Sequence, residues 1–268
     1  MTTPTPTPTS RQVPLRPGVT LAVRESGHGA PVLLLHGGPG PDSLTPLAEH
    51  LATRHRVLLP VHPGWDDTRR IPELTTVGDL AEAYLELIRQ LDAHPAAVVG
   101  SSFGGWIAAE MALRDTGRHL DRLVLMNAIG PAVPGHPLSV PGPPTGPSDP
   151  SGNSAAPPTA DGKSEAPRRV SSPAGLAALR AYTGPTMQDE GLLGRLKDAG
   201  RPVLVVWGED DTVVSPDYGR TYAAAFPDAR FVPIPGGGHL PTREQPTATF
   251  AAIDGFLSTP AAPHTPKP

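Results

Sequence analysis

The stretch "VVGSSFGGWIAAEMA" (residues 98–112) joins a short apolar run to a run with helical spacing, through a turn rich in glycine. A strand that passes directly into a helix forces strained backbone angles on the residue between them, and the neighbours two positions away must lack bulk. Ser102 stands at that position, with Gly100 and Gly104 on either side. The pattern predicts a tight strand–turn–helix that presents the hydroxyl of Ser102 for chemistry.

The same turn also contains Ser101, which is expected to lie inside the turn and to hydrogen-bond locally. The helix that begins after Ser102 directs its free amides and partial positive charge at whatever Ser102 attacks. The pattern therefore favours Ser102 as a nucleophile. The alternative interpretation is a loop that needs glycine only for flexibility.

Composition excludes several classes of function. The chain has 268 residues and a formal net charge of −4, which gives no basis for binding nucleic acid or an anionic membrane surface. It has no cysteine, so disulfides, thiolate metal sites and cysteine nucleophiles are excluded. The start of the chain has no apolar core typical of a signal peptide, and no run approaches the ~18 apolar residues of a membrane span. A cytoplasmic location is expected.

Proline is concentrated in particular segments, and these segments suggest how the chain is divided. Proline-rich segments without periodic apolar positions are typical of disorder. The expected division is a disordered tail at 1–11, a core formed by 12–130 and 199–258, a cap insertion at 131–198 that is proline-rich and disordered over 131–173, and a second disordered tail at 259–268.

Strands and helices are expected to alternate along both ordered blocks. The apolar patterns predict strands at 19–25, 31–35, 56–62, 96–100, 120–128, 201–208 and 229–235, and helices at 44–52, 77–91, 103–114, 174–182, 190–199, 215–226 and 242–257. This alternation predicts an α/β fold: a doubly wound, mostly parallel sheet flanked by helices. In such sheets the active site lies at the carboxyl ends of the strands.

Two strand ends carry the groups that a nucleophilic serine requires. A serine hydroxyl needs a base to remove its proton, and that base needs an acid to orient it. His239 in "PGGGH" follows the last predicted strand, and Asp211 in "GEDD" follows the strand before it. The chain order Ser102, Asp211, His239 is the order expected of such a triad in a fold of this class.

The remaining histidines are expected to have other roles. His36 is expected to be a structural loop residue, and His62 lies near the predicted cleft and could line it. No histidine or cysteine spacing suggests a metal site, so neither a metal nor a cofactor is predicted.

An oxyanion formed during acyl transfer needs two backbone amides. The amide of Phe103, directly after the nucleophile, is one candidate. The second is Gly38 in "HGGPG", which follows the strand at 31–35.

Taken together, the motifs "LLLHGGPG", "HPGW", "VVGSSFGGWIAAEMA", "VWGEDDTVVSP" and "IPGGGHLPTREQP" resemble the α/β-hydrolase superfamily in type and order. The resemblance implies that Ser102 is the nucleophile, Asp211 the acid and His239 the base. Asp210 is the rival acid, but the usual Gly-x-x-Asp spacing from Gly208 selects Asp211. Some members carry the acid after the earlier strand, where this chain has Asn127.

The resemblance implies a serine hydrolase that acts through an acyl-enzyme on a small-molecule ester or related acyl substrate. Dehalogenases and epoxide hydrolases of similar sequence use aspartate where this chain has Ser102. "HGGPG" also resembles proline iminopeptidases, which usually have tryptophan at the position of Phe103. Three alternatives stay open: hydrolysis of a carbon–carbon bond, perhydrolysis, and ligand binding without turnover. The sequence carries no signal for an oligomeric state.

Overall fold

The computed structural model describes residues 8–139 and 172–259. Most of the proline-rich segment, and most of each expected tail, lie outside the described residues. The expected disorder of those segments and the division into core and cap therefore stay predictions. Within the described ranges, no helix combines the length and apolar character needed to cross a membrane.

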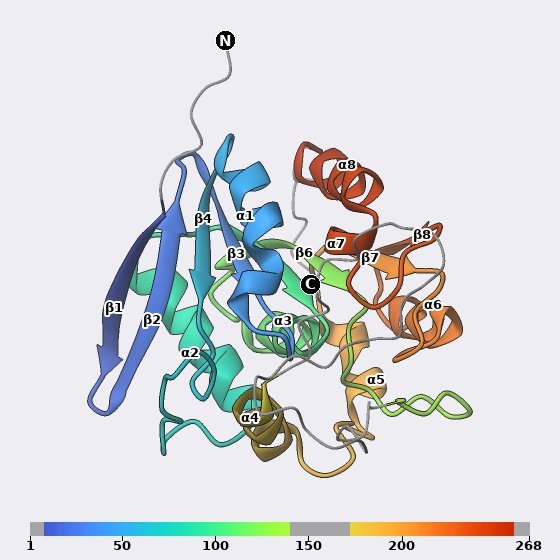
Figure 1. Ribbon diagram of the computed structural model, residues 1–268, viewed down its shortest axis with the longest axis horizontal. Coiled ribbons are helices and arrows are strands. Elements are labelled where there is room, and N and C mark those ends of the chain that lie inside the picture. The colour runs from blue at the N-terminus through green and yellow to red at the C-terminus, as the bar shows by residue number, and fades with distance from the viewer. Residues whose placement is uncertain (1–7, 140–171, 260–268) are drawn as a thin grey trace, which may run out of the picture.

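An eight-stranded sheet forms the centre of the protein (Figure 1). The strands are β1 (Thr9–Arg16), β2 (Val19–Ser26), β3 (Ala30–Leu35), β4 (His55–Pro60), β5 (Ala96–Ser101), β6 (Leu120–Met126), β7 (Val203–Gly208) and β8 (Ala229–Ile234), in the spatial order β1-β2-β4-β3-β5-β6-β7-β8. β2 pairs antiparallel with both β1 and β4, and every other pairing is parallel. The predicted mostly parallel α/β architecture is confirmed.

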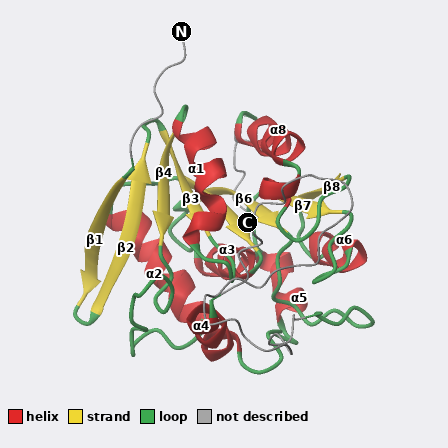
Figure 2. Ribbon diagram, in the orientation of Figure 1, coloured by secondary structure: helices red, strands yellow, loops and turns green. Residues whose placement is uncertain are grey.

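Helices cover both faces of this sheet (Figure 2). α1 (Thr45–Ala52) and α8 (Pro246–Leu257) pack on one face, and α2 (Val77–Gln90), α3 (Phe103–Arg114) and α6 (Pro216–Ala224) pack on the other. Successive strand residues point to opposite faces. On β3, Val32 and Leu34 join the apolar cluster beneath α1 and α8, whereas Leu33 and Leu35 join the cluster beneath α2 and α3. The continuous apolar strands are thus buried on both sides.

The remaining elements are short, apart from one helix. They are η1 (Pro41–Leu44), α4 (Pro173–Thr183), α5 (Leu192–Arg195), η2 (Leu196–Asp198) and α7 (Pro241–Glu244). The single helix expected at 190–199 is one α-helical turn followed by a 3₁₀ turn. The helix expected at 44–52 begins as the 3₁₀ turn η1.

Strand β1 was not among the predicted strands. Its first residues, 9–11, fall within the segment expected to be a tail, and its remaining residues lie at the start of the expected core. Only Val13 of this strand is buried, so the strand has almost no apolar alternation to detect. Its backbone pairing with β2 along the edge of the sheet holds it in place instead.

The predicted helix at 242–257 is two helices, α7 and α8, divided before Pro246. Proline has no N–H to continue a helix, and it disfavours helical angles in the residue before it. Gln245 accordingly has φ −135° and ψ 59°. Pro246 then occupies the first turn of α8, where a missing N–H has no cost.

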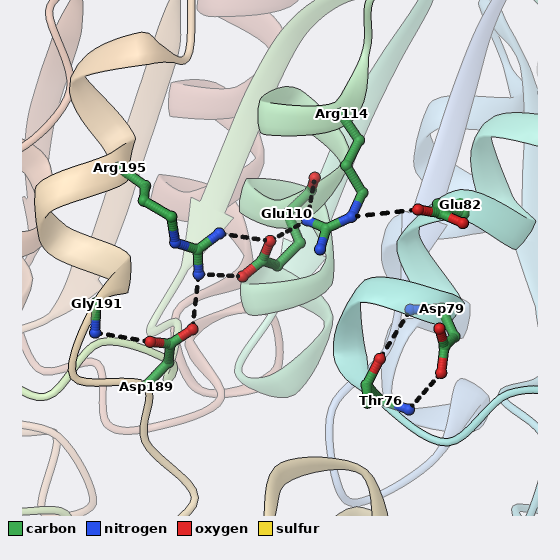
Figure 3. Close-up of polar contacts among 8 residues, drawn as sticks. All are labelled: Thr76, Asp79, Glu82, Glu110, Arg114, Asp189, Gly191 and Arg195. Carbon is green, nitrogen blue, oxygen red and sulfur yellow. Dashed lines mark hydrogen bonds and ion pairs between the residues drawn. The ribbon is translucent and has the colours of Figure 1, made fainter.

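A cluster of charged side chains joins the segment 189–195 to helix α3 (Figure 3). Glu110 on α3 is almost fully buried and receives hydrogen bonds from both Arg114 and Arg195. Arg195 also donates to Asp189, at 2.6 Å. Burial raises the pKa of Glu110, but the two guanidinium groups lower it by more, so the net pKa is lowered. An ionised Glu110 therefore connects the elements that follow α4 to the core.

Candidate active site

The turn between β5 and α3 has the predicted strained geometry. Ser102 has φ 52° and ψ −114°, which L-residues rarely adopt. A Cβ atom on Gly100 would lie 2.3 Å from the carbonyl oxygen of Gly104, and one on Gly104 would lie 2.0 Å from that of Leu35. Both positions therefore require glycine, because the opposing atoms belong to the backbone.

Ser102, His239 and Asp211 lie together at the carboxyl ends of the parallel strands. Ser102 Oγ is 3.0 Å from Nε2 of His239, and Nδ1 of His239 is 2.9 Å from Oδ2 of Asp211. With its proton on Nδ1, the imidazole donates to the carboxylate and accepts from the serine hydroxyl. This arrangement is geometrically suited to moving a proton from Ser102 to His239 while Asp211 holds the ring in place.

Four hydrogen bonds besides that of His239 fix Asp211 and the His239 loop. The amides of Val213 and Val214 donate to Oδ1 of Asp211. Asn127, which is fully buried, donates its Nδ2–H to Oδ2 of Asp211 at 2.6 Å, and the same nitrogen lies 3.2 Å from the carbonyl oxygen of Gly238. Both carboxylate oxygens of Asp211 therefore have donors that fix the orientation of the side chain.

Exposure differs between the candidate residues, Ser102 and Asp211, and their neighbours, Ser101 and Asp210. Asp210 is exposed, whereas the side chain of Asp211 is fully buried against His239. Ser101 is the last residue of β5 and is 2% exposed. Ser102 is 7% exposed.

The loop at 36–40 lies against the candidate nucleophile. A Cβ atom on Gly37 would come within 2.9 Å of Cβ and 3.5 Å of Oγ of Ser102. The following residue, Gly38, is one of the two residues predicted to bind the oxyanion. The other, Phe103, is the first residue of α3, so its N–H has no acceptor within the helix.

Phe103, the residue that follows Ser102, belongs to a stack of three aromatic side chains. Trp65 stacks on Phe103 with ring centroids 5.8 Å apart, and Tyr182 from α4 stacks on both rings. All three side chains are nearly buried. The described part of the structure therefore places the ring of Phe103 in a buried aromatic layer.

Several residues of this site were not identified as functional candidates from the sequence. Asn127 was noted only as lacking a carboxylate, although its place at a strand end was a usable signal. His62 was expected near the cleft but is fully buried behind the loop at 36–40, where its Nε2 contacts the carbonyl oxygen of His36. Tyr84 belongs to the apolar stripe of α2, and periodicity gives no sign that its hydroxyl reaches His62.

Comparison with known proteins shows partial sequence similarity to curated enzymes. The chain is 31% identical over 122 residues to 2-hydroxymuconate semialdehyde hydrolase of Pseudomonas sp. (strain CF600), covering 44% of this chain and 43% of that protein. It is also 31% identical over 127 residues to the AB hydrolase superfamily protein YisY of Bacillus subtilis (strain 168), covering 46% and 47%. The chain thus spans less than half the length of the curated relatives it matches.

Similarity of fold extends over nearly the whole chain. The structure of a thermophilic esterase from Thermogutta terrifontis superimposes with a TM-score of 0.71 and 21% identity, covering 93% of this chain and 98% of the esterase. At that identity the match shows a shared fold. The model of the alpha/beta hydrolase family matches residues 32–253, which contain most of both ordered blocks and every candidate site residue. This protein therefore belongs to the alpha/beta hydrolase family.

Proposed function

We propose that this protein is a serine hydrolase, and that it cleaves a small ester or related acyl compound through an acyl-enzyme. The proposal rests on the unbroken series of contacts from Oγ of Ser102 to Nε2 of His239, at 3.0 Å, and from Nδ1 of His239 to Oδ2 of Asp211, at 2.9 Å. A structural network has no need for the strained backbone of Ser102, which costs free energy and is typical of functional positions.

In the proposed mechanism His239 acts first as a base. It takes the proton of Ser102 as Oγ attacks the carbonyl carbon of the substrate, and Asp211 stabilises the imidazolium that forms. The tetrahedral oxyanion is held by the amides of Phe103 and Gly38. His239 then gives its proton to the leaving group, which leaves the acyl group on Ser102. A water molecule, activated by His239 in the same way, releases the acid.

The aromatic layer of Trp65, Phe103 and Tyr182 supports a small acyl group. These rings are stacked and nearly buried, and Phe103 directly follows Ser102 in the chain. We propose that the layer borders the acyl site, so a long chain would have to displace the rings. We therefore expect turnover of p-nitrophenyl esters to fall as the acyl chain lengthens.

A fluorophosphonate probe and p-nitrophenyl acetate test this proposal together. Wild-type protein should be labelled at Ser102 and should hydrolyse the ester. Ser102→Ala should abolish labelling and lower kcat by roughly 10⁴- to 10⁶-fold with an unchanged thermal melt, because removal of a triad member has costs of this size. Ser101→Ala is the matched control and should retain both activities. Absence of both labelling and turnover in the wild-type protein would instead indicate a binding protein.

The similarity to 2-hydroxymuconate semialdehyde hydrolase favours carbon–carbon bond hydrolysis as the second candidate. The same three residues could serve that reaction. Turnover of 2-hydroxymuconate semialdehyde at a higher kcat/KM than any ester in the acyl series would select it.

A further inference from the structure

Three consecutive carbonyl groups of the loop at 36–40 receive ring N–H donors from the side away from solvent. The carbonyl oxygen of His36 is 2.9 Å from Nε2 of His62, that of Gly37 is 2.8 Å from Nδ1 of His36, and that of Gly38 is 2.9 Å from Nε1 of Trp65. The rings of His36 and His62 stack with centroids 3.8 Å apart, and both side chains are fully buried. Every peptide plane from 36 to 39 is thus held by an aromatic nitrogen.

The hydrogen-bond partners decide where each imidazole carries its proton. The backbone N–H of His62 donates to Nε2 of His36 at 3.1 Å, so the proton of His36 lies on Nδ1 and points to Gly37. Nε2 of His62 faces a carbonyl oxygen and carries the proton, so its Nδ1 accepts from the hydroxyl of Tyr84 at 2.5 Å. Burial lowers the pKa of His36 and lowers that of His62 to about 3, so both rings are neutral at neutral pH.

The bond from His36 to Gly37 has a consequence for the next amide. In a planar trans peptide the carbonyl oxygen and the following N–H point in opposite directions. Because the oxygen of Gly37 is held toward the buried histidine, the N–H of Gly38 points away from it. Gly37 itself lies directly against Ser102, so the fixed plane borders the space beside the nucleophile.

We propose that His36, His62, Tyr84 and Trp65 are positioning residues that fix the Gly38 amide as an oxyanion donor. The inference rests on the proposed function, because it concerns the same acyl-transfer site. None of the four side chains touches the reacting atoms in this account. His36 acts on the peptide between Gly37 and Gly38 directly, together with the amide of Gly40, which donates to the same oxygen at 3.1 Å. Trp65 and His62, the latter held by Tyr84, fix the peptides on either side, so the Gly38 N–H cannot rotate away from the oxyanion.

A donor that acts on the oxyanion stabilises the transition state more than the bound substrate. Loss of orientation should therefore lower kcat and leave KM nearly unchanged. Complete loss of one oxyanion donor costs about 10²- to 10³-fold in kcat. A misoriented donor should cost less, roughly 10- to 100-fold.

Two substitutions of His36 separate orientation from simple packing. The amide nitrogen of asparagine is as many bonds from Cβ as Nδ1 of histidine, so His36→Asn keeps a donor for the carbonyl of Gly37. Glutamine matches Nε2 instead, so His36→Gln keeps only the contact with the N–H of His62. We expect kcat of His36→Asn to stay within about fivefold of wild type and kcat of His36→Gln to fall roughly 10- to 100-fold, with KM within about twofold. If His36 had only a structural role, His36→Gln should keep more activity than His36→Asn, because glutamine fills more of the cavity. That result, or equal losses of kcat in the two variants, would overturn the proposal.

Trp65→Phe provides an independent test if either histidine variant fails to fold, as judged by circular dichroism and a thermal melt. It removes the indole N–H from the carbonyl of Gly38 and keeps an aromatic ring against Phe103 and Tyr182. We expect about a tenfold lower kcat at constant KM, and an unchanged kcat would contradict the inference. Failure of the proposed function is recognised separately, because wild-type protein would then show neither labelling of Ser102 nor ester turnover.

Discussion

Ser102 lies between β5 and α3, where backbone atoms crowd both flanking glycines, whereas side-chain hydrogen bonds help to hold the loop that carries His239. On the first side, the carbonyl oxygens of Gly104 and Leu35 leave no room for a Cβ atom. On the second side, Asn127 and Glu244 bond the carbonyl and the amide of Gly238, next to His239.

The two halves of the site should therefore tolerate different kinds of substitution. A contact between backbone atoms cannot relax by a side-chain rotation, so a change at either flanking glycine should affect folding and activity together. A side-chain hydrogen bond can be removed singly or replaced by a similar group. Changes at the histidine side should therefore give graded losses of activity with little loss of stability.

Asp211→Asn should have the largest effect of the changes on the histidine side. The two backbone amides that donate to Oδ1 favour the oxygen of the asparagine amide at that position, so its NH2 group takes the place of Oδ2 and faces Nδ1 of His239. An N–H donated to Nδ1 favours the tautomer that leaves Nε2 protonated and unable to take the proton of Ser102. We expect kcat for an ester to fall by about 10⁴-fold, with the fold intact by circular dichroism. Asp210→Asn is the matched control, since Asp210 is exposed. A larger loss in that control would reverse the assignment of the acid.

Gly100→Ala should have the next largest effect, and on stability as well as activity. Its Cβ would lie 2.3 Å from the oxygen and 2.5 Å from the carbonyl carbon of Gly104, so backbone must move. Overpacking of this kind costs about 3 kcal/mol, which corresponds to a fall in Tm of roughly 6–12 °C for a chain of this size. Gly194→Ala is the control, because a Cβ atom there would meet no atom of a neighbouring element within 4 Å. Similar melting temperatures for the two variants would contradict the account.

The same contrast explains how far the sequence could predict the structure. The serine side depends on local chain geometry, and glycine spacing between a strand and a helix carries that information directly. The sheet and both of its helical layers were predictable for the same reason, since apolar periodicity is local. The sequence also indicated Ser102, Asp211 and His239, which the structure brings into contact.

The features that the sequence did not predict depend on contacts with partners that are distant in the sequence. Asn127 bonds Asp211 across 84 positions, and the hydroxyl of Tyr84 reaches His62 from a helix that looks purely apolar. The edge strand β1 has one buried side chain and is held by backbone pairing with β2. None of these contacts leaves a periodic or short-range pattern in the sequence.

Asn127→Ala should give an intermediate loss. It removes the donor to Oδ2 of Asp211 and the contact with the carbonyl of Gly238. A hydrogen bond to a charged group contributes about 1.5–3 kcal/mol, so kcat should fall roughly 10- to 100-fold. Asn127→Gln is not an adequate control, because the longer side chain has no room at a fully buried position. Asn127→Ser keeps a small donor and should lose less than the alanine variant. Wild-type kcat in Asn127→Ala would show that the backbone amides of Val213 and Val214 suffice to hold the acid.

The smallest effect is expected at Glu244, whose carboxylate accepts a hydrogen bond from the amide of Gly238. The side chain of Glu244 is exposed, so water can replace much of what the carboxylate supplies. Glu244→Gln keeps a carbonyl oxygen at the same position and should leave kcat within about twofold of wild type, whereas Glu244→Ala should lower it roughly threefold, consistent with a net hydrogen bond of ~0.5–1 kcal/mol. Steady-state rates on a short p-nitrophenyl ester resolve differences of this size if protein concentration is set by titration of Ser102 with the fluorophosphonate probe. A loss in Glu244→Ala as large as that in Asn127→Ala would mean that the amide of Gly238, rather than its carbonyl, controls the placement of His239.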